Sequence, residues 1–520
     1  MAAQREPTKP APGMLRRFQF SLGANLARGA LSFVNGIIIA RAIGAASYGD
    51  LNFLLASFTS IIALADMGGG SAFFSFLAGR SRHRRFFAVY ALMLAAQFCL
   101  TAAVVLWLPG GWFHMVWVGQ HRGLVLLAFL ASFLSIQIWN AFIWLGEALR
   151  RTGLVQSLNV ARAGLHTLLL LAAFGFGWLD LKVVLWLLAV EYAAFVAFFA
   201  RGLLRANLDA PAAEPPSYRA IAREFLRYCQ PLILYVWVCF IYTFADRWLL
   251  QTFGGSIQQG LFSIGQQFST IALLVTRSVL NVFWKEVAEA SEIGDRARLE
   301  RVYRVVVKGV YLVAAFICAA MVPYSREILR VALGMGFVSG AACLSLMFLY
   351  PVHQSLGQVQ AAFFYATRDT RMQTLMGVVT MALSLPAAYL LLAPRTAAIP
   401  GLGLGALGLA VKLVMVQIVV INLQAWVIDL RHGWRHILGF QLVLPVLLGV
   451  ALLSRQAVTW AATLLHFGHA LFWIAGLGIG GYCVAAVALL LAAPGIAGFR
   501  REEVVEIWHR LAPRASRAAA

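Results

Sequence analysis

The chain has 520 residues, of which 61% are hydrophobic and only 12% are charged, and its formal net charge is +21. Soluble domains carry about 25% charged residues, so this composition excludes an ordinary soluble protein and indicates that lipid surrounds most of the chain. Basic residues that gather between membrane spans follow from the positive-inside rule, so the positive charge favours membrane topology over nucleic-acid binding.

Fourteen apolar runs follow one another from Phe18 almost to the C-terminus. Each is long enough to cross a bilayer as a helix, since about 20 apolar residues span the hydrocarbon core. We therefore predict an all-α integral membrane protein with about 14 transmembrane helices. The spans are placed at residues 18–43, 48–76, 86–108, 123–147, 155–177, 181–203, 226–252, 258–282, 306–325, 336–365, 373–394, 401–428, 437–454 and 468–493.

The spans group into two six-helix lobes and two C-terminal helices. A break in hydrophobicity separates the lobes, and it contains APAAEPP and the amphipathic stretch Tyr218–Phe225, which predicts a linker with a helix lying on the membrane surface. The expected segments are an N-terminal tail (1–17), an N-lobe (18–203), a linker (204–225), a C-lobe (226–428), two further spans (429–493) and a C-terminal tail (494–520).

The distribution of basic residues predicts the orientation. Of the 42 lysines and arginines, 30 fall on the side that holds both termini, six on the opposite side and six within spans. The positive-inside rule then places the N- and C-termini in the cytoplasm. The loops on the opposite side are short and almost free of carboxylates.

An internal repeat relates the two lobes in this interpretation. The end of the first span and the start of the second read ARAIGAASYGDLNFLLASF, with Arg41 and Gly49. The corresponding region of the seventh and eighth spans reads ADRWLLQTFGGSIQQGLFSIGQQF, with Arg247 and Gly260. Parallel repeats of this kind predict a substrate site between the repeats near the membrane midplane.

Polar residues recur at helical spacing inside the spans, where each is costly unless it faces protein or water. Arg28 lies in such a stripe on the first span, and Arg277 lies in a similar stripe on the eighth. We interpret them as cationic groups of a wet cavity that attract an anion such as a phosphate. The candidate cavity residues are Arg28, Arg277, Asn25, Asn35, Gln267, Arg162 and Lys412.

Three acidic residues are candidates for ion coupling or ion pairing: Asp66, Glu191 and Asp246. A carboxyl near the midplane, such as Glu191, is typical of proton relays, although a backbone carbonyl could equally hold it as a neutral acid. Structural interpretations stay open for the cations as well. Arg28 could pair with Asp66, and Arg277 could extend to the inner membrane surface.

The sequence contains no motif that indicates an enzyme. Between the spans there is no Gly-rich phosphate loop, no zinc-type Cys/His spacing and no nucleophile elbow. The six cysteines lie inside apolar segments, and we interpret them as packing residues. We therefore expect no catalytic residues, no cofactor and no metal site.

A series of short motifs runs through both halves. The first half carries Asn25, then ARAIGAASYGDLNF and ALADMGGG. The second carries PLIL from Pro231, ADRWLL around Asp246, GLFSIGQQF around Gly260 and then GLGLGALGLA. These motifs resemble those of the polysaccharide and O-antigen flippases of the MOP exporter superfamily, which read AR-x-LG-x-x-x-YG and D-x-G. Ala45 replaces the proline that is common in that family, and LLLAPRTAAIPG stands where N-x-x-L-I-P is usual.

The resemblance implies a flippase of the bacterial inner membrane. Its substrate would be an undecaprenyl-pyrophosphate-linked oligosaccharide, moved to the outer leaflet by alternating access, with H⁺ or Na⁺ as a possible coupling ion and polysaccharide polymerase and export proteins as possible partners. Another exporter of the superfamily, for peptidoglycan precursors or drugs, is the alternative within the class. A membrane polymerase or glycosyltransferase is the alternative from another class, and it needs an acid/base set on an exposed loop, which we do not find.

Overall fold

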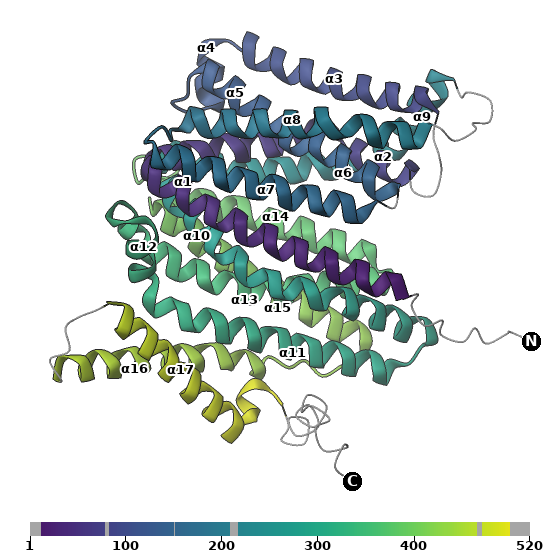
Figure 1. The fold of residues 1–520 in the computed structure, drawn as a ribbon. Coiled ribbons are helices and arrows are strands. Elements are labelled where there is room, and N and C mark those ends of the chain that lie inside the picture. The colour runs from purple at the N-terminus through teal and green to yellow at the C-terminus, as the bar shows by residue number, and fades with distance from the viewer. Residues whose placement is uncertain (1–11, 78–82, 150, 209–216, 465–470, 500–520) are drawn as a thin grey trace, which may run out of the picture. The chain divides into compact units, whose positions relative to one another are not determined.

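The computed structural model describes residues 12–77, 83–149, 151–208, 217–464 and 471–499, and these residues form helices and no β-strand (Figure 1). The helices before the middle of the chain are α1 (Pro12–Asp66), α2 (Gly69–Leu77), α3 (Arg84–Trp107), α4 (Gly110–Val116), α5 (Arg122–Ser132), a π-helix (Phe133–Ile138), α6 (Trp139–Ala148), α7 (Thr152–Gly175), α8 (Leu181–Leu208) and α9 (Tyr218–Cys229). Those that follow are α10 (Ile233–Ile293), α11 (Arg296–Met321), α12 (Ser325–Leu333), α13 (Ala341–Ala366), α14 (Thr370–Leu392), α15 (Gly405–His432), α16 (Val443–Leu464) and α17 (Leu471–Ala492).

The helices confirm the predicted membrane fold. Within the described residues, 12 helical stretches are long and apolar enough to cross a membrane. Two of them, Gly23–Asp66 and Tyr218–Ile271, are 44 and 54 residues long. A helix of 44 residues extends about 66 Å, whereas the hydrocarbon core is about 30 Å thick. Each long stretch therefore has the length of two crossings, and the predicted fourteen spans are accommodated.

A single glycine interrupts each of the two longest helices. Gly44 divides α1, with φ 76° and ψ 172°, and Gly255 divides α10, with φ 74° and ψ −179°. Only glycine adopts this backbone conformation without steric cost. The same local break thus occurs once in each predicted half of the chain.

The segments after the two breaks touch backbone to backbone. A Cβ atom on Gly49 would lie 1.8 Å from the carbonyl oxygen of Ser256, and a Cβ atom on Gly260 would lie 2.1 Å from the carbonyl oxygen of Ala45. Each of these oxygens belongs to the residue directly after a helix-breaking glycine, and each close glycine follows its break by five residues. An internal duplication predicts this reciprocal contact.

The predicted equivalence of Arg41 and Arg247 is wrong in register. Arg41 lies three residues before its break at Gly44, whereas Arg247 lies eight residues before Gly255. The glycines of the repeat therefore match, but these two arginines do not occupy corresponding turns.

The chain divides into two compact units. The first unit runs to Gly260 and includes Leu392–Gly405, and the second comprises Leu261–Leu391 and the chain from Ala406 onward. In the first unit, α7 packs along α1 and also against α8 (Figure 1). In the second unit, α11 packs against α13 and α16, and α16 packs against α17.

The helix predicted at the amphipathic stretch is present as α9, and its location on the membrane surface stays a prediction. Ile221 and Phe225 are buried, and the Phe225 ring stacks on Phe86 of α3 at a centroid distance of 5.5 Å. Exposed arginines occupy the opposite face of the helix: Arg219, Arg223 and Arg227. The second amphipathic stretch of the sequence, from residue 499 to residue 511, lies outside the described residues except for Phe499.

Candidate functional site

Asp66 ends α1 and accepts hydrogen bonds from the next helix. The backbone N–H of Gly70 donates to its two carboxylate oxygens at 3.2 and 3.1 Å, and the side-chain amide of Gln137 donates at 2.6 Å. These contacts cap the N-terminus of α2. The alternative that Arg28 pairs with Asp66 is wrong, since the Arg28 guanidinium donates to Asn25 Oδ1 at 3.2 Å instead.

The glycines after Asp66 serve helix packing. A Cβ atom on Gly69 would lie 2.1 Å from Cε of Met93, and one on Gly70 would lie 2.3 Å from the ring of Trp144. Larger residues at these positions would push α2 away from its neighbours. The ALADMGGG motif is therefore explained by the local structure of the first unit.

Three ionisable side chains meet between α7 and α8, and we call Arg162, His166 and Glu191 the ionic cluster. They are 8%, 6% and 4% exposed. His166 Nδ1 lies 2.9 and 3.0 Å from the two carboxylate oxygens of Glu191. Arg162 Nη1 lies 3.9 Å from the Glu191 carboxylate. Arg162 and His166 are four residues apart on α7, so both side chains reach the same face of α8.

The Arg162 guanidinium lies over two aromatic rings. Its central carbon lies 4.2 Å from the ring centroid of Tyr192 and 5.9 Å from that of Trp139. Trp139 is itself fixed by a 2.9 Å hydrogen bond from its indole N–H to Asn159 Oδ1. The Nε atom of Arg162 is buried and has no hydrogen-bond partner among the described residues. The guanidinium therefore has donor capacity that the described protein does not use.

Arg28 approaches the same region from α1. Its side chain is exposed, and it lies on the helix that packs along α7. The structure thus brings together two of the predicted site residues, Arg162 and Glu191. Two participants, His166 and Tyr192, were not among the predicted site residues. Their signal was available, because His166 is one helical turn from Arg162 and Tyr192 adjoins Glu191.

The remaining predicted residues lie elsewhere. In the first unit, Asn35 is buried and its Oδ1 has no hydrogen-bond partner among the described residues, and Asp246 on α10 is half-buried. In the second unit, Gln267 is half-buried and Lys412 on α15 is buried. Arg277 lies on α10, and its side chain is outside the part of the chain whose side chains are described.

Asp50 joins three donors in the first unit, and the sequence analysis did not single it out. Its Oδ1 accepts hydrogen bonds from Gln120 at 2.8 Å, from Gln251 at 3.2 Å and from the Ser256 hydroxyl at 2.6 Å. The donors come from distant parts of the sequence. Because its Oδ1 accepts three hydrogen bonds within the first unit, we interpret Asp50 as a structural residue beside the glycine contact.

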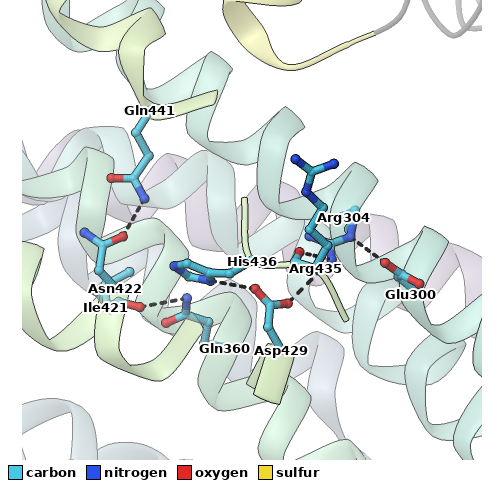
Figure 2. Close-up of polar contacts among 9 residues, drawn as sticks. All are labelled: Glu300, Arg304, Gln360, Ile421, Asn422, Asp429, Arg435, His436 and Gln441. Atoms are coloured by element: carbon cyan, nitrogen blue, oxygen red, sulfur yellow. Dashed lines mark hydrogen bonds and ion pairs between the residues drawn. The ribbon is translucent and has the colours of Figure 1, made fainter. Parts of the chain in front are cut away.

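A second polar group lies in the second unit (Figure 2). Arg304 on α11 lies 3.7 Å from the Asp429 carboxylate, pairs with Glu300 at 2.8 Å and donates to the Arg435 carbonyl at 2.7 Å. His436 Nδ1 lies 2.7 Å from the other oxygen of Asp429. These contacts fasten the segment after α15 to α11.

A small cavity adjoins this second group. Its volume is about 20 Å³, which is room for about one water molecule. It is too small for a sugar, so we place no oligosaccharide in it. Its lining residues are Tyr303, Arg304, Val307, Lys308, Leu356, Gln360, Ala425, Asp429, Ile437, Leu438, Phe440 and Gln441.

Comparisons with known proteins place these features in a family. The family model described as "Polysaccharide biosynthesis protein" matches residues 14–283, which is just over half of the chain. The comparison with curated protein sequences gave no match.

Several solved structures are similar in fold. A lipid II flippase MurJ in an inward closed conformation is 12% identical, with 91% of this chain and 99% of that chain covered and a TM-score of 0.64. An inward-facing multidrug resistance MATE family transporter of the MOP superfamily is 16% identical, with 78% and 94% covered and a TM-score of 0.55. A MOP superfamily transporter from Pyrococcus furiosus is 14% identical, with 81% and 95% covered and a TM-score of 0.51. At these identities the likeness shows the fold.

The apolar helices and the likeness to these solved structures define a multi-pass helical membrane protein with the fold that MOP superfamily transporters share. The sequence match makes the assignment more specific. The chain belongs to the polysaccharide biosynthesis protein family.

Proposed function

We propose that the protein is a flippase for an undecaprenyl-pyrophosphate-linked oligosaccharide. It moves the repeat unit from the cytoplasmic to the outer leaflet of the bacterial inner membrane by alternating access, for surface polysaccharide assembly. Family membership supports a role in polysaccharide synthesis. The observation that carries the substrate class is Arg162, a buried cation with an unused donor, on a helix that packs along α1, which carries a second cation at Arg28.

The chemistry of the substrate explains why such cations are needed. A pyrophosphate loses its hydration shell when it enters a low-dielectric protein interior, which is costly unless charged groups replace the water. Arginine presents five N–H donors in a planar fork that matches phosphate oxygens. A flippase makes and breaks no covalent bond, so its residues need only bind and release the headgroup.

The other assignments are parts of the same proposal. Asn25 and Asn35 of the first unit, and Gln267, Arg277 and Lys412 of the second, remain candidates from the sequence for contact with the headgroup, and Asp246 is a candidate for ion pairing. Both termini are cytoplasmic, as the distribution of basic residues favours. The polymerase and export proteins of the same polysaccharide act on the product in the outer leaflet.

Gene deletion with complementation tests this function. We expect loss of surface polysaccharide and accumulation of the complete lipid-linked repeat unit in the cytoplasmic leaflet, both restored by the wild-type gene. Variants Arg28→Ala and Arg162→Gln should insert normally but fail to restore polysaccharide. Arg122→Gln is the matched control, because Arg122 donates to backbone carbonyls at the end of α3, away from the ionic cluster.

The identity of the accumulated lipid separates the alternatives. A peptidoglycan precursor in place of the repeat unit would assign the protein to cell-wall synthesis. Incomplete repeat units would indicate an enzyme of assembly. Normal polysaccharide with altered drug resistance would indicate a drug exporter, and full complementation by both arginine variants would refute the proposed binding residues.

A further inference from the structure

In the ionic cluster, the Glu191 carboxylate lies near two groups: Arg162, which is a cation, and His166, which is a cation when protonated. Glu191 lies within hydrogen-bond distance of His166, at 2.9 and 3.0 Å, whereas Arg162 is 3.9 Å away. A hydrogen bond between charged or polar groups is strong at the first distance and absent at the second. The histidine therefore holds the carboxylate, and the arginine makes only a loose ion pair with it.

The charge of the cluster depends on the proton of His166. With a neutral imidazole, Arg162 and Glu191 compensate each other. With an imidazolium, two cations share one carboxylate, and the closer His166 neutralises it. The surplus positive charge then resides on Arg162, whose buried Nε has no described hydrogen-bond partner. A buried surplus charge is costly, so an anion that pairs with it is favoured.

We propose that His166 and Glu191 form a proton-binding site that switches Arg162 from its carboxylate to the anionic headgroup of the substrate. This inference rests on the proposed function and names H⁺ as the coupled ion. A proton taken up at the imidazole and a phosphate group bound at Arg162 stabilise each other. Proton and headgroup consequently bind together, and the loss of either one weakens the binding of the other.

Among the described residues around the cluster, no other group would take up the proton in place of His166. The Tyr192 ring of α8 lies against Arg162 of the cluster, and the neighbouring α1, which packs along α7, carries Arg28. From α6 the neighbour is the Trp139 indole, which does not titrate. Histidine is the side chain that ordinarily changes charge between about pH 5 and pH 8.

Thermodynamic reciprocity determines in which direction pH changes the affinity for an anion. If protonation strengthens anion binding, anion binding must strengthen protonation by the same factor. Coupling between sites is typically about 5- to 150-fold. We therefore expect wild-type affinity for a pyrophosphate anion to weaken about tenfold between about pH 6 and pH 8, beyond any change that belongs to the probe itself.

The experiment uses the purified full-length chain in lipid nanodiscs and inorganic pyrophosphate as the probe. Calorimetric titrations in buffers of different ionisation enthalpy measure both the affinity and the number of protons taken up. His166→Gln keeps a donor for Glu191 but cannot hold the proton, so its affinity should be weak and independent of pH relative to wild type. The probe's own titration is common to all variants and cancels in that ratio.

Glu191→Gln gives the opposite result if the inference is correct. Without a competing carboxylate, Arg162 is available at every pH, so the affinity at about pH 8 should equal or exceed that of wild type at about pH 6. His353→Gln is the matched control, because His353 is another buried histidine in a spanning helix, α13 of the second unit. It should retain the full pH dependence.

The outcomes distinguish the two proposals. Equal pH dependence in wild type and His166→Gln, with binding that still requires Arg162, would overturn proton coupling and leave the flippase assignment intact. Binding that survives in Arg162→Gln and Arg28→Ala would overturn the anion site itself. Thermal melting of each variant shows whether it is folded, and Glu191→Gln provides the positive signal that an unfolded variant cannot produce.

Discussion

Replacing Gly49 with alanine tests the close contact between the segments after the two helix breaks. The new Cβ atom would lie 1.8 Å from the Ser256 carbonyl oxygen and 2.8 Å from the Gly260 nitrogen. Carbon and oxygen atoms ordinarily approach to about 3.3 Å, so the two backbones must separate by about 1.5 Å. Neither clashing atom belongs to a side chain that can rotate away. Overpacking costs about 1–3 kcal/mol, and we expect the upper end of this range.

Thermal unfolding of the purified protein in detergent measures this effect. Gly164→Ala on α7 is the matched control, because a Cβ atom there meets nothing within 4 Å. Alanine is better than glycine in a helix by about 0.5–1 kcal/mol, so the control should melt at or slightly above the wild-type temperature. Gly260→Ala should behave like Gly49→Ala, since its Cβ atom would lie 2.1 Å from a backbone oxygen. If Gly49→Ala melts at the same temperature as Gly164→Ala, the two backbones are not in close contact at Gly49, and the expected clash is refuted.

Three further substitutions test the polar contacts. Asp50→Ala leaves three donors without their acceptor and should lower the free energy of unfolding by about 2 kcal/mol, seen as a lower melting temperature than that of Asp50→Asn. Asp66→Ala removes the cap of α2 at a cost of about 1 kcal/mol, and hydrogen exchange of the first α2 amides should become faster; unchanged exchange would contradict the capping role. Asp429→Ala removes the carboxylate that pairs with Arg304 and contacts His436, so the segment 433–441 should be cleaved faster by protease, and equal cleavage rates would show that these contacts do not hold it.

Local physics explains what could be predicted along the chain. A membrane span reveals itself through about 20 consecutive apolar residues, because the bilayer demands them wherever the helix lies. The apolar spans, the all-α fold and the amphipathic helix α9 follow from such local patterns. Arg162 and Glu191 stood out for the same reason, since a charge inside an apolar helix is costly without a role.

Contacts between distant residues required the tertiary structure. The sequence paired Arg28 with Asp66 as one possibility, whereas folding satisfies Asp66 through Gln137 and Gly70. The position of His166 one turn from Arg162 is visible in the sequence, but its contact with Glu191 forms only when α7 packs on α8.

The sequence by itself determined that this protein is a helical membrane protein, where its helices run and which buried charges need an explanation. The tertiary structure alone decided which charges meet. Hydrophobicity is a property of each segment, whereas the distance between Arg162, His166 and Glu191 depends on how two helices pack and rotate about their axes. A rotation of one helix by a single residue, about 100°, would separate these side chains without changing the hydrophobicity of any span.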